Sequence, residues 1–418
     1  MSRRFTLLVI ATLLTVPAVP AGASAETPAP AVAPVDFHSW QTHDFWHAGS
    51  RDGVSPTRDG LRIGRPAGTV EHTEPGVGTR SYEYGSWTSP VYRQGFDATQ
   101  LVASWNARTP AGTWLQVDMR GRTATEVETT WYGMGRWALG DADIARTSLP
   151  DQEDANGYID VDTFVANPGT TLRSYQLRVT LYRVAGSKQS PTLSMAGAMT
   201  SAIPDRFAVP TSPRGAAWGI ELPVPAYSQN IHVGQYPQYG GGGEAWCSPT
   251  STQMVVEYYG KRPSKEDLAW VDPSYADPSV DHAARFMYDK DYDGTGNWPF
   301  NTAYAATYGL KAHVTRLHSL TELERYIRRG IPVITSQSFL ATELDGAGYG
   351  TAGHIMVVVG FTATGDVIAN DPASSGNDKV RHVYKRAQFE NVWQRTKRYR
   401  ADGTVAGGPG GIAYIITR

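Results

Sequence analysis

Two hydrophobic patterns divide this chain. Before about residue 200, apolar side chains recur at every second position, as over 175–182 and again over 115–120. This period is typical of half-buried antiparallel strands. Turn-forming residues such as those at 109–112 separate the runs. The pattern therefore predicts an all-β sandwich of the jelly-roll kind over residues 36–200.

The pattern changes after a proline-bearing stretch at 201–213, where we place the domain boundary. Residues 249–259 predict a helix that ends at Gly260, and a capping box at Ser319 opens a second helix, which a buried strand follows. Residues 355–370 predict a hairpin of two strands. We expect residues 214–418 to form an α+β domain that folds without the first half.

The N-terminus has the features of an export signal. Arg3 and Arg4 precede an apolar run, and Ala23-Ser24-Ala25 matches the small-residue cleavage pattern. Residues 1–25 are thus a predicted signal peptide and 26–35 a flexible leader. No later stretch reaches the roughly 18 consecutive apolar residues of a membrane helix. We therefore expect a secreted protein, extracellular or associated with the cell wall, without a membrane span.

The charges of the chain nearly balance, with 38 Lys+Arg against 40 Asp+Glu. This balance argues against nucleic acid as a dedicated partner. The aromatic content points instead to a well-packed protein, and seven tryptophans fall in the first half. Most should be core. Trp114 is the strongest candidate for exposure because it alternates with Leu115, and an exposed tryptophan would suit a cell-wall glycan.

Cys247 is the only cysteine, so no internal disulfide can form. It directly precedes the helix predicted at 249–259, and Pro249 suits a first helical turn. A helix N-terminus lowers the pKa of a thiol placed there, which favours the nucleophilic thiolate. The alternatives are a small buried hydrophobe or an accidental free thiol.

His354 is the best candidate for a base, because it stands at the mouth of an otherwise apolar strand. Asp371 ends the partner strand of the predicted hairpin. If the hairpin loop holds an even number of residues, the two side chains share a face, and a bulge or twist must close the gap between them. Their roles would then be partner of the thiolate and orienter of the imidazole.

Four motifs in order resemble the secreted C39-like cysteine peptidases of papain-like fold, over about 221–418. They are Val224-Pro225-Ala226-Tyr227-Ser228-Gln229, Trp246-Cys247-Ser248-Pro249-Thr250-Ser251, Gly353-His354 with its valine strand, and Asn370-Asp371-Pro372. The resemblance implies a papain-like peptidase domain over 214–418, with Cys247 as nucleophile and His354 as base. It further implies that Asp371 is the third member and that Gln229 lines the oxyanion hole.

The chain departs from the family pattern in three respects. Ser248 follows the nucleophile where these peptidases often have glycine. Gln229 lies 18 residues before Cys247, a longer gap than usual, so Gln235 and Gln238 remain rivals for the oxyanion role. Family members fused to transporters clip double-glycine leaders, but this chain has no transporter, so we do not expect that substrate.

Residues 289–294 imitate the start of a calcium loop, but Phe300 stands where a bidentate glutamate belongs, which favours an acidic turn. We therefore expect neither metal nor cofactor. Our interpretation is a secreted cysteine peptidase acting on peptides or proteins. The alternatives are a hydrolase of peptidoglycan stem peptides and an inactive glycan- or wall-binding protein. The sequence leaves open the natural substrate, the ligand of the sandwich, the oligomeric state and any inhibitory pro-segment.

Overall fold

The computed structural model describes residues 33–418, which form one compact unit. The predicted signal peptide and residues 26–32 of the predicted leader lie outside the described residues. Within the described part of the chain, no helix is long and apolar enough to cross a membrane.

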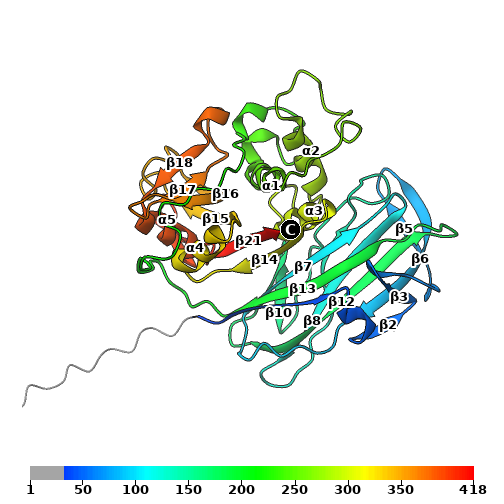
Figure 1. Cartoon of the computed structure of the whole chain (residues 1–418). Helices are drawn as coiled ribbons and strands as arrows, with labels where there is room; N and C mark the ends of the chain where they lie inside the picture. The colour runs from blue at the N-terminus through cyan, green and yellow to red at the C-terminus, as the bar shows by residue number, and fades with distance from the viewer. Residues whose placement is uncertain (1–32) are drawn as a thin grey trace, which may run out of the picture. The chain divides into compact units, whose positions relative to one another are not determined.

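The first half consists of two antiparallel sheets (Figure 1). One sheet has the order β10-β11-β7-β13-β4-β3, with β1 also paired to β13, and the other has the order β2-β6-β12-β8-β9, with β5 also paired to β6. The strands are β1 (Val35–Gln41), β2 (Ser50–Asp52), β3 (Val54–Thr57), β4 (Gly60–Ile63), β5 (Gly68–Glu74), β6 (Gly78–Thr88), β7 (Gln100–Arg108), β8 (Thr113–Thr123), β9 (Tyr132–Trp137), β10 (Gly157–Asp160), β11 (Thr163–Ala166), β12 (Leu172–Val184) and β13 (Thr192–Ser201).

Alternation along these strands produces the core between the sheets, as predicted. In β12 the side chains of Tyr175, Leu177, Val179 and Leu181 are buried, and they join residues of β7, β8 and β13 in one cluster. The two sheets therefore pack face to face through their apolar sides.

The tryptophans of the first half are mostly core, but the expectation for Trp114 was wrong. Trp114 does lie on the face opposite Leu115, yet it is only 3% exposed. A separate cluster that includes Tyr82 and Ile144 covers it, and its ring stacks on Tyr182. A loop thus buries the residue on which the glycan hypothesis was based, and alternation along one strand does not reveal such a cover.

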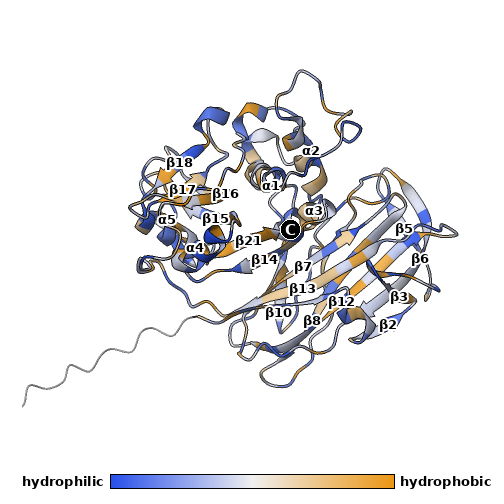
Figure 2. Cartoon of the chain, in the orientation of Figure 1, coloured by the Kyte–Doolittle hydropathy of each residue, from blue (hydrophilic) through white to orange (hydrophobic). Residues whose placement is uncertain are grey.

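The second half contains a six-stranded antiparallel sheet of order β14-β21-β15-β16-β17-β18. Its strands are β14 (Lys311–Arg316), β15 (Val333–Phe339), β16 (Thr351–Phe361), β17 (Val367–Asn370), β18 (Arg381–Tyr384) and β21 (Ile412–Thr417), and a small hairpin pairs β19 (Lys397–Tyr399) with β20 (Val405–Gly407). Hydrophobic residues dominate β21 (Figure 2), as expected of a strand in the interior of a sheet.

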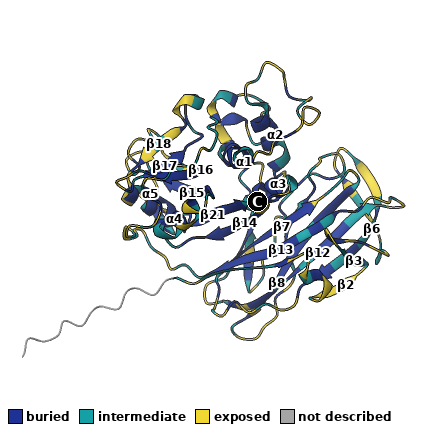
Figure 3. Cartoon of the chain, in the orientation of Figure 1, coloured by how far each residue is buried: buried dark blue, intermediate teal, exposed yellow. Residues whose placement is uncertain are grey.

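Helices cover both faces of this sheet. They are α1 (Cys247–Tyr258), α2 (Pro278–Met287), α3 (Trp298–Thr307), α4 (Leu320–Arg328) and α5 (Arg386–Gln394), with short 3-10 turns at Asn230–His232, Gly243–Ala245 and Asn377–Lys379. Another 3-10 turn, Asp44–Trp46, lies in the first half. Along β16, Ile355 and Val357 join a cluster with α1, whereas Met356 and Val358 join one with α4 and α5. The central strands are therefore buried, and exposed residues gather in loops and on the edge strand β18 (Figure 3).

The local signals read from the sequence are found here. Helix α1 begins at Cys247 itself, two residues before the predicted start, and Gly260 follows it with φ +74°. Ser319 caps α4 by accepting from the Glu322 N–H, while the Glu322 carboxylate accepts from the N–H of His318. In a standard capping box the Glu322 carboxylate would accept from the N–H of Ser319 itself, so here the second hydrogen bond is displaced by one residue.

The two halves share contacts well beyond the connection at 202–213. Phe300 of α3 lies in the sandwich core, with its ring 5.5 Å from that of Trp137. Asn106 of β7 both donates to and accepts from the backbone of Ala312, so sandwich side chains satisfy the outer edge of β14. This covering stabilises an edge strand that would otherwise expose unpaired groups.

Candidate active site

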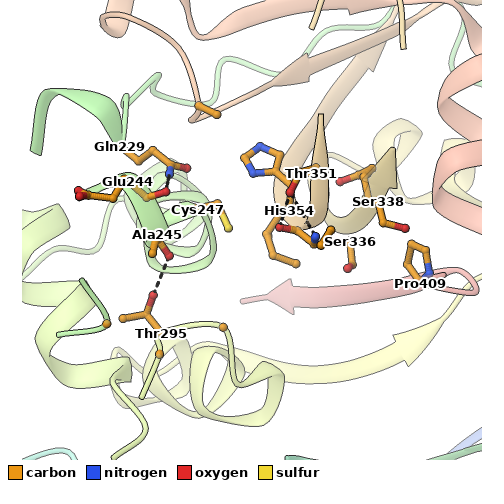
Figure 4. A pocket seen from close by; sticks show the side chains of 18 of the residues that line it. Gln229, Glu244, Ala245, Cys247, Thr295, Ser336, Ser338, Thr351, His354 and Pro409 are labelled. Carbon is orange, nitrogen blue, oxygen red and sulfur yellow. Dashed lines mark hydrogen bonds between the residues drawn. The ribbon is translucent and has the colours of Figure 1, made fainter. Parts of the chain in front are cut away.

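A cleft of about 890 Å³ brings together three of the four residues singled out from the sequence. Cys247, His354 and Gln229 all line it, and Asp371 lies directly behind His354. In Figure 4, Cys247 and Gln229 lie on one wall near the start of α1, and His354 lies across from them.

Cys247 is the first residue of α1, and its side chain is partly exposed to the cleft. The preceding Trp246 is fully buried, and its indole N–H donates to the carbonyl of Tyr239 at 2.7 Å. This anchor fixes the start of the helix. Because the first N–H groups of a helix have no partner within it, the backbone N–H of Cys247 is available to a ligand in the cleft.

His354 and Asp371 form a direct pair, with Nε2 of the ring 2.8 Å from Oδ1 of the carboxylate. The hairpin between them differs from the even loop considered from the sequence. Phe361 pairs with Val367, which leaves five residues in the loop, and a bulge between Val358 and Gly360 shifts the register by one. A loop with an odd number of residues would turn the two side chains to opposite faces of the sheet, and the one-residue bulge reverses this. His354 and Asp371 therefore face the same side.

The electrostatics of the pair favour a charged imidazole. Burial of the His354 ring opposes its positive charge, but the Asp371 carboxylate, together with the interaction with Cys247, raises the pKa of His354 to about 10. Burial would likewise raise the pKa of Asp371, but the charge and hydrogen bond of His354 and two tyrosine hydroxyls hold it well below its usual range. These interactions favour the imidazolium form at neutral pH.

The Asp371 carboxylate has further donors that the sequence did not reveal. The hydroxyls of Tyr349 and Tyr384 donate to its Oδ2 at 2.9 and 2.7 Å, and the backbone N–H of Ala373 donates to its Oδ1 at 3.0 Å. The two tyrosines come from separate segments with no shared spacing. Only the tertiary structure could bring them together.

Gln229 is held by the loop that follows Asp371. Its backbone N–H donates to the carbonyl of Pro372 at 2.8 Å, and its side-chain Nε2 donates to the carbonyl of Glu244 at 2.9 Å. An amide nitrogen carries two hydrogens, so one remains for a ligand. The rivals Gln235 and Gln238 do not line the cleft, and Gln235 bonds His232 instead.

Two further residues singled out from the sequence, Ser248 and Asp289, are buried and bonded within the fold. The hydroxyl of Ser248 is buried and lies 3.0 Å from that of Tyr414, so it points into the fold. Asp289, the first residue of the calcium-like stretch, is buried and accepts hydrogen bonds from Ser148 and Asn297. Within residues 33–418, no group of side chains suits a metal ion.

A partly exposed thiol at a helix start, beside an imidazole held by a carboxylate, is an arrangement that cysteine hydrolases use. Comparison with protein families agrees with this class. Residues 36–201 match the Peptidase C39 N-terminal domain, and residues 221–401 match the Peptidase_C39 like family. The C-terminal half thus matches the C39-like peptidase family, and the residues before it match the N-terminal domain of C39 peptidases.

Among solved structures, the chain is similar to a putative C39-like peptidase from Bacillus anthracis, with 19% identity, 48% of this chain and 97% of that chain covered, and a TM-score of 0.30. It is also similar to a carbohydrate-binding module of the β-sandwich superfamily, with 9% identity, 40% of this chain and 55% of that chain covered, and a TM-score of 0.15. Neither likeness is close enough to carry an argument. The comparison with curated proteins found no match.

Proposed function

We propose that this protein is a secreted cysteine peptidase with a papain-like C-terminal half, which hydrolyses peptide bonds through Cys247, His354 and Asp371. The observation that carries the proposal is the 2.8 Å contact between His354 and Asp371 in the cleft that exposes Cys247. The match of residues 221–401 to a peptidase family supports it. The export signal read from residues 1–25 is the basis for proposing secretion.

In the first half of the reaction, the Cys247 thiolate attacks the carbonyl carbon of the scissile bond. The negative oxygen that forms is stabilised by the backbone N–H of Cys247 and the second Nε2 hydrogen of Gln229. Because Nε2 of His354 is engaged by Asp371, Nδ1 is the nitrogen that gives its proton to the leaving amine. The C–N bond then breaks, and a thioester to Cys247 remains.

In the second half, neutral His354 takes a proton from water at the same Nδ1. The resulting hydroxide attacks the thioester carbonyl, and the same two donors stabilise the oxyanion. The C–S bond breaks, so that the acid product leaves and the thiolate–imidazolium pair is restored. Asp371 keeps the ring in the required orientation throughout.

Digestion of a casein-type protein and of isolated cell wall by the same preparation tests this function. We expect new peptide ends from the protein, and none with the Cys247→Ala variant as control. Stem peptides released from the wall, with the protein left intact, would instead support the peptidoglycan hydrolase. If neither substrate is cleaved and the thiol resists electrophilic peptide mimics, the binding-protein alternative gains.

A further inference from the structure

Within residues 33–418, the first half of the chain contributes one wall residue to the cleft. Asp160 is exposed at the end of β10 and lines the same cavity as Cys247, although it belongs to the sandwich sheet. The next two residues form the tight turn to β11, because Asp160 pairs with Thr163.

This turn is anchored and strained. The buried Asp162 carboxylate accepts a hydrogen bond, 2.7 Å long, from the backbone N–H of Trp298. Trp298 is the first residue of α3. Val161 has φ +54°, a left-handed conformation that a β-branched residue rarely adopts. Such strain persists only where surrounding contacts hold it, and it gathers at functional sites. The position of Asp160 beside the cleft is thus fixed by the structure.

The cleft is acidic although the chain as a whole is nearly neutral. Two exposed acidic residues, Asp160 and Asp293, are among the residues that line it, whereas the Glu244 carboxylate points away from Cys247 and His354 (Figure 4). The lining residues in the described chain include no lysine or arginine. Tyr292 lies among these groups: burial raises its pKa first, and the charges of Cys247 and Asp160 are among those that add to this. A cleft lined by one sign of charge attracts ligands of the opposite sign.

A second observation points to a ligand that donates hydrogen bonds. Gln337 is fully buried, pairs with His354 across β15 and β16, and also lines the cleft. Its Nε2 donates to Thr335, but within residues 33–418 no group donates to its Oε1. A buried acceptor without a donor is costly, so a donor from the substrate would satisfy it.

We propose that the cleft selects cationic peptides, with a lysine or arginine side chain close to the scissile bond, and that Asp160 of the N-terminal domain is a specificity-determining residue. The substrate class follows from the acidic residues Asp160 and Asp293, from the absence of lysine and arginine among the described lining residues, and from the unpaired Gln337 acceptor, since ammonium and guanidinium groups only donate. This inference rests on the proposed peptidase function and adds the substrate class to it.

The first test begins with a mixed peptide library, from which one peptide that the protein cleaves is chosen. The hydrolysis of this peptide is then compared with that of the same peptide with its lysine or arginine replaced by glutamine. We expect kcat/KM to favour the cationic peptide, and Asp160→Asn to reduce this preference about two- to fivefold, the effect of one exposed charge. The control is Asp59→Asn, which removes an exposed carboxylate from another two-residue turn of the same sheet. An equal preference in wild type and Asp160→Asn would overturn the role of Asp160.

The second test needs no turnover. Cys247 is modified with a cationic trimethylammonium methanethiosulfonate and with an anionic sulfonate analogue, and the rate ratio is divided by that of a free small thiol. We expect the normalised ratio of the cationic rate to the anionic rate to exceed one and to decrease as salt is added. The ratio should also decrease in Asp160→Asn but not in Asp59→Asn. A ratio of one would overturn the inference even if peptides are cleaved. A high ratio without any peptide cleavage would leave the acidic cleft standing and contradict the peptidase function.

Discussion

At the scale of the residue, the account depends on the charge of His354. Because Asp371 and Cys247 raise its pKa to about 10 against the opposing effect of burial, the folded protein binds a proton that the unfolded chain releases near pH 6.5. The stabilisation from this pair is therefore complete below about pH 6.5 and is lost as the pH rises towards 10. The same charge favours the imidazolium that the proposed reaction needs at neutral pH.

The pH dependence of turnover should follow from this charge. We expect kcat/KM to fall on the alkaline side near pH 10, where His354 loses the proton that it gives to the leaving amine. In Asp371→Asn the carboxylate charge is absent, so the alkaline limb should move down by at least about one pH unit. Rate profiles of both proteins measure this shift. An unchanged alkaline limb in Asp371→Asn would show that another group sets it.

A graded series of variants separates the roles. Cys247→Ala should have no activity and His354→Ala should lose about 10²–10⁴-fold. Asp371→Asn should retain measurable activity, because an amide oxygen can still accept from His354 while its nitrogen donates to the oxygens of Tyr349 or Tyr384. Asp371→Ala should be weaker than Asp371→Asn, since the ring is then free to rotate. Turnover of a generic peptide gives the order, and wild-type activity in His354→Ala would show that another histidine is the base.

The residues with recognisable chemistry and local context could be picked out from the sequence, since Cys247, His354 and Gln229 line one cleft and Asp371 lies directly behind His354. Their catalytic roles stay predictions. The sequence did not reveal Tyr349, Tyr384 and Gln337, which have ordinary neighbours and gain their importance only from tertiary contacts. Asp160 was missed for the same reason, because it comes from the other half of the chain.

At the scale of the element, caps and turns were readable from the sequence but the register was not. Gly260 and Ser319 mark helix ends by local chemistry, and the structure has both. The bulge between Val358 and Gly360 has no such mark, because it lies within a run of valines. It arises where Leu222 donates its N–H to the carbonyl of Val359, a contact between distant segments.

Helix α3 offers a test at this scale, because Asn297 has two functions. Its Oδ1 accepts from the N–H of Phe300 as a cap, and its Nδ2 donates to the buried carboxylate of Asp289 at 2.8 Å. Asn297→Ala should therefore lower the free energy of unfolding by about 2–4 kcal/mol. Ser319→Ala removes only a cap and should cost about 1 kcal/mol. Denaturant titrations compare them, and equal losses would mean that the bond to Asp289 contributes nothing.

At the scale of the whole molecule, the two halves share core contacts. The sequence predicted a boundary at 201–213, and the two family matches lie on either side of it. The connection is nevertheless held in place, since Arg206 donates to the carbonyl of Gln394 and Ser212 to the carboxylate of Glu390. Periodicity reveals where a pattern changes, but it cannot show whether cores are shared.

The fragment 214–418 should therefore not fold as a stable unit, contrary to the expectation from the sequence. Alone, it would expose Phe300 and the outer edge of β14, which the sandwich covers. As a control, the full chain cut by a protease within 202–213 should keep both pieces together in gel filtration. Circular dichroism and thermal melting test the fragment, and a cooperative melt like that of the full chain would contradict the shared core.

The most direct test of the central claim is the rate at which iodoacetamide alkylates Cys247 in the native protein as the pH is varied. Cys247 is the only cysteine, so each label reports on this thiol. We expect rapid labelling near neutral pH, and much slower labelling in His354→Ala, because the imidazolium that stabilises the thiolate is then absent. A native thiol that stays unreactive and is labelled only after denaturation would contradict a nucleophilic role for Cys247.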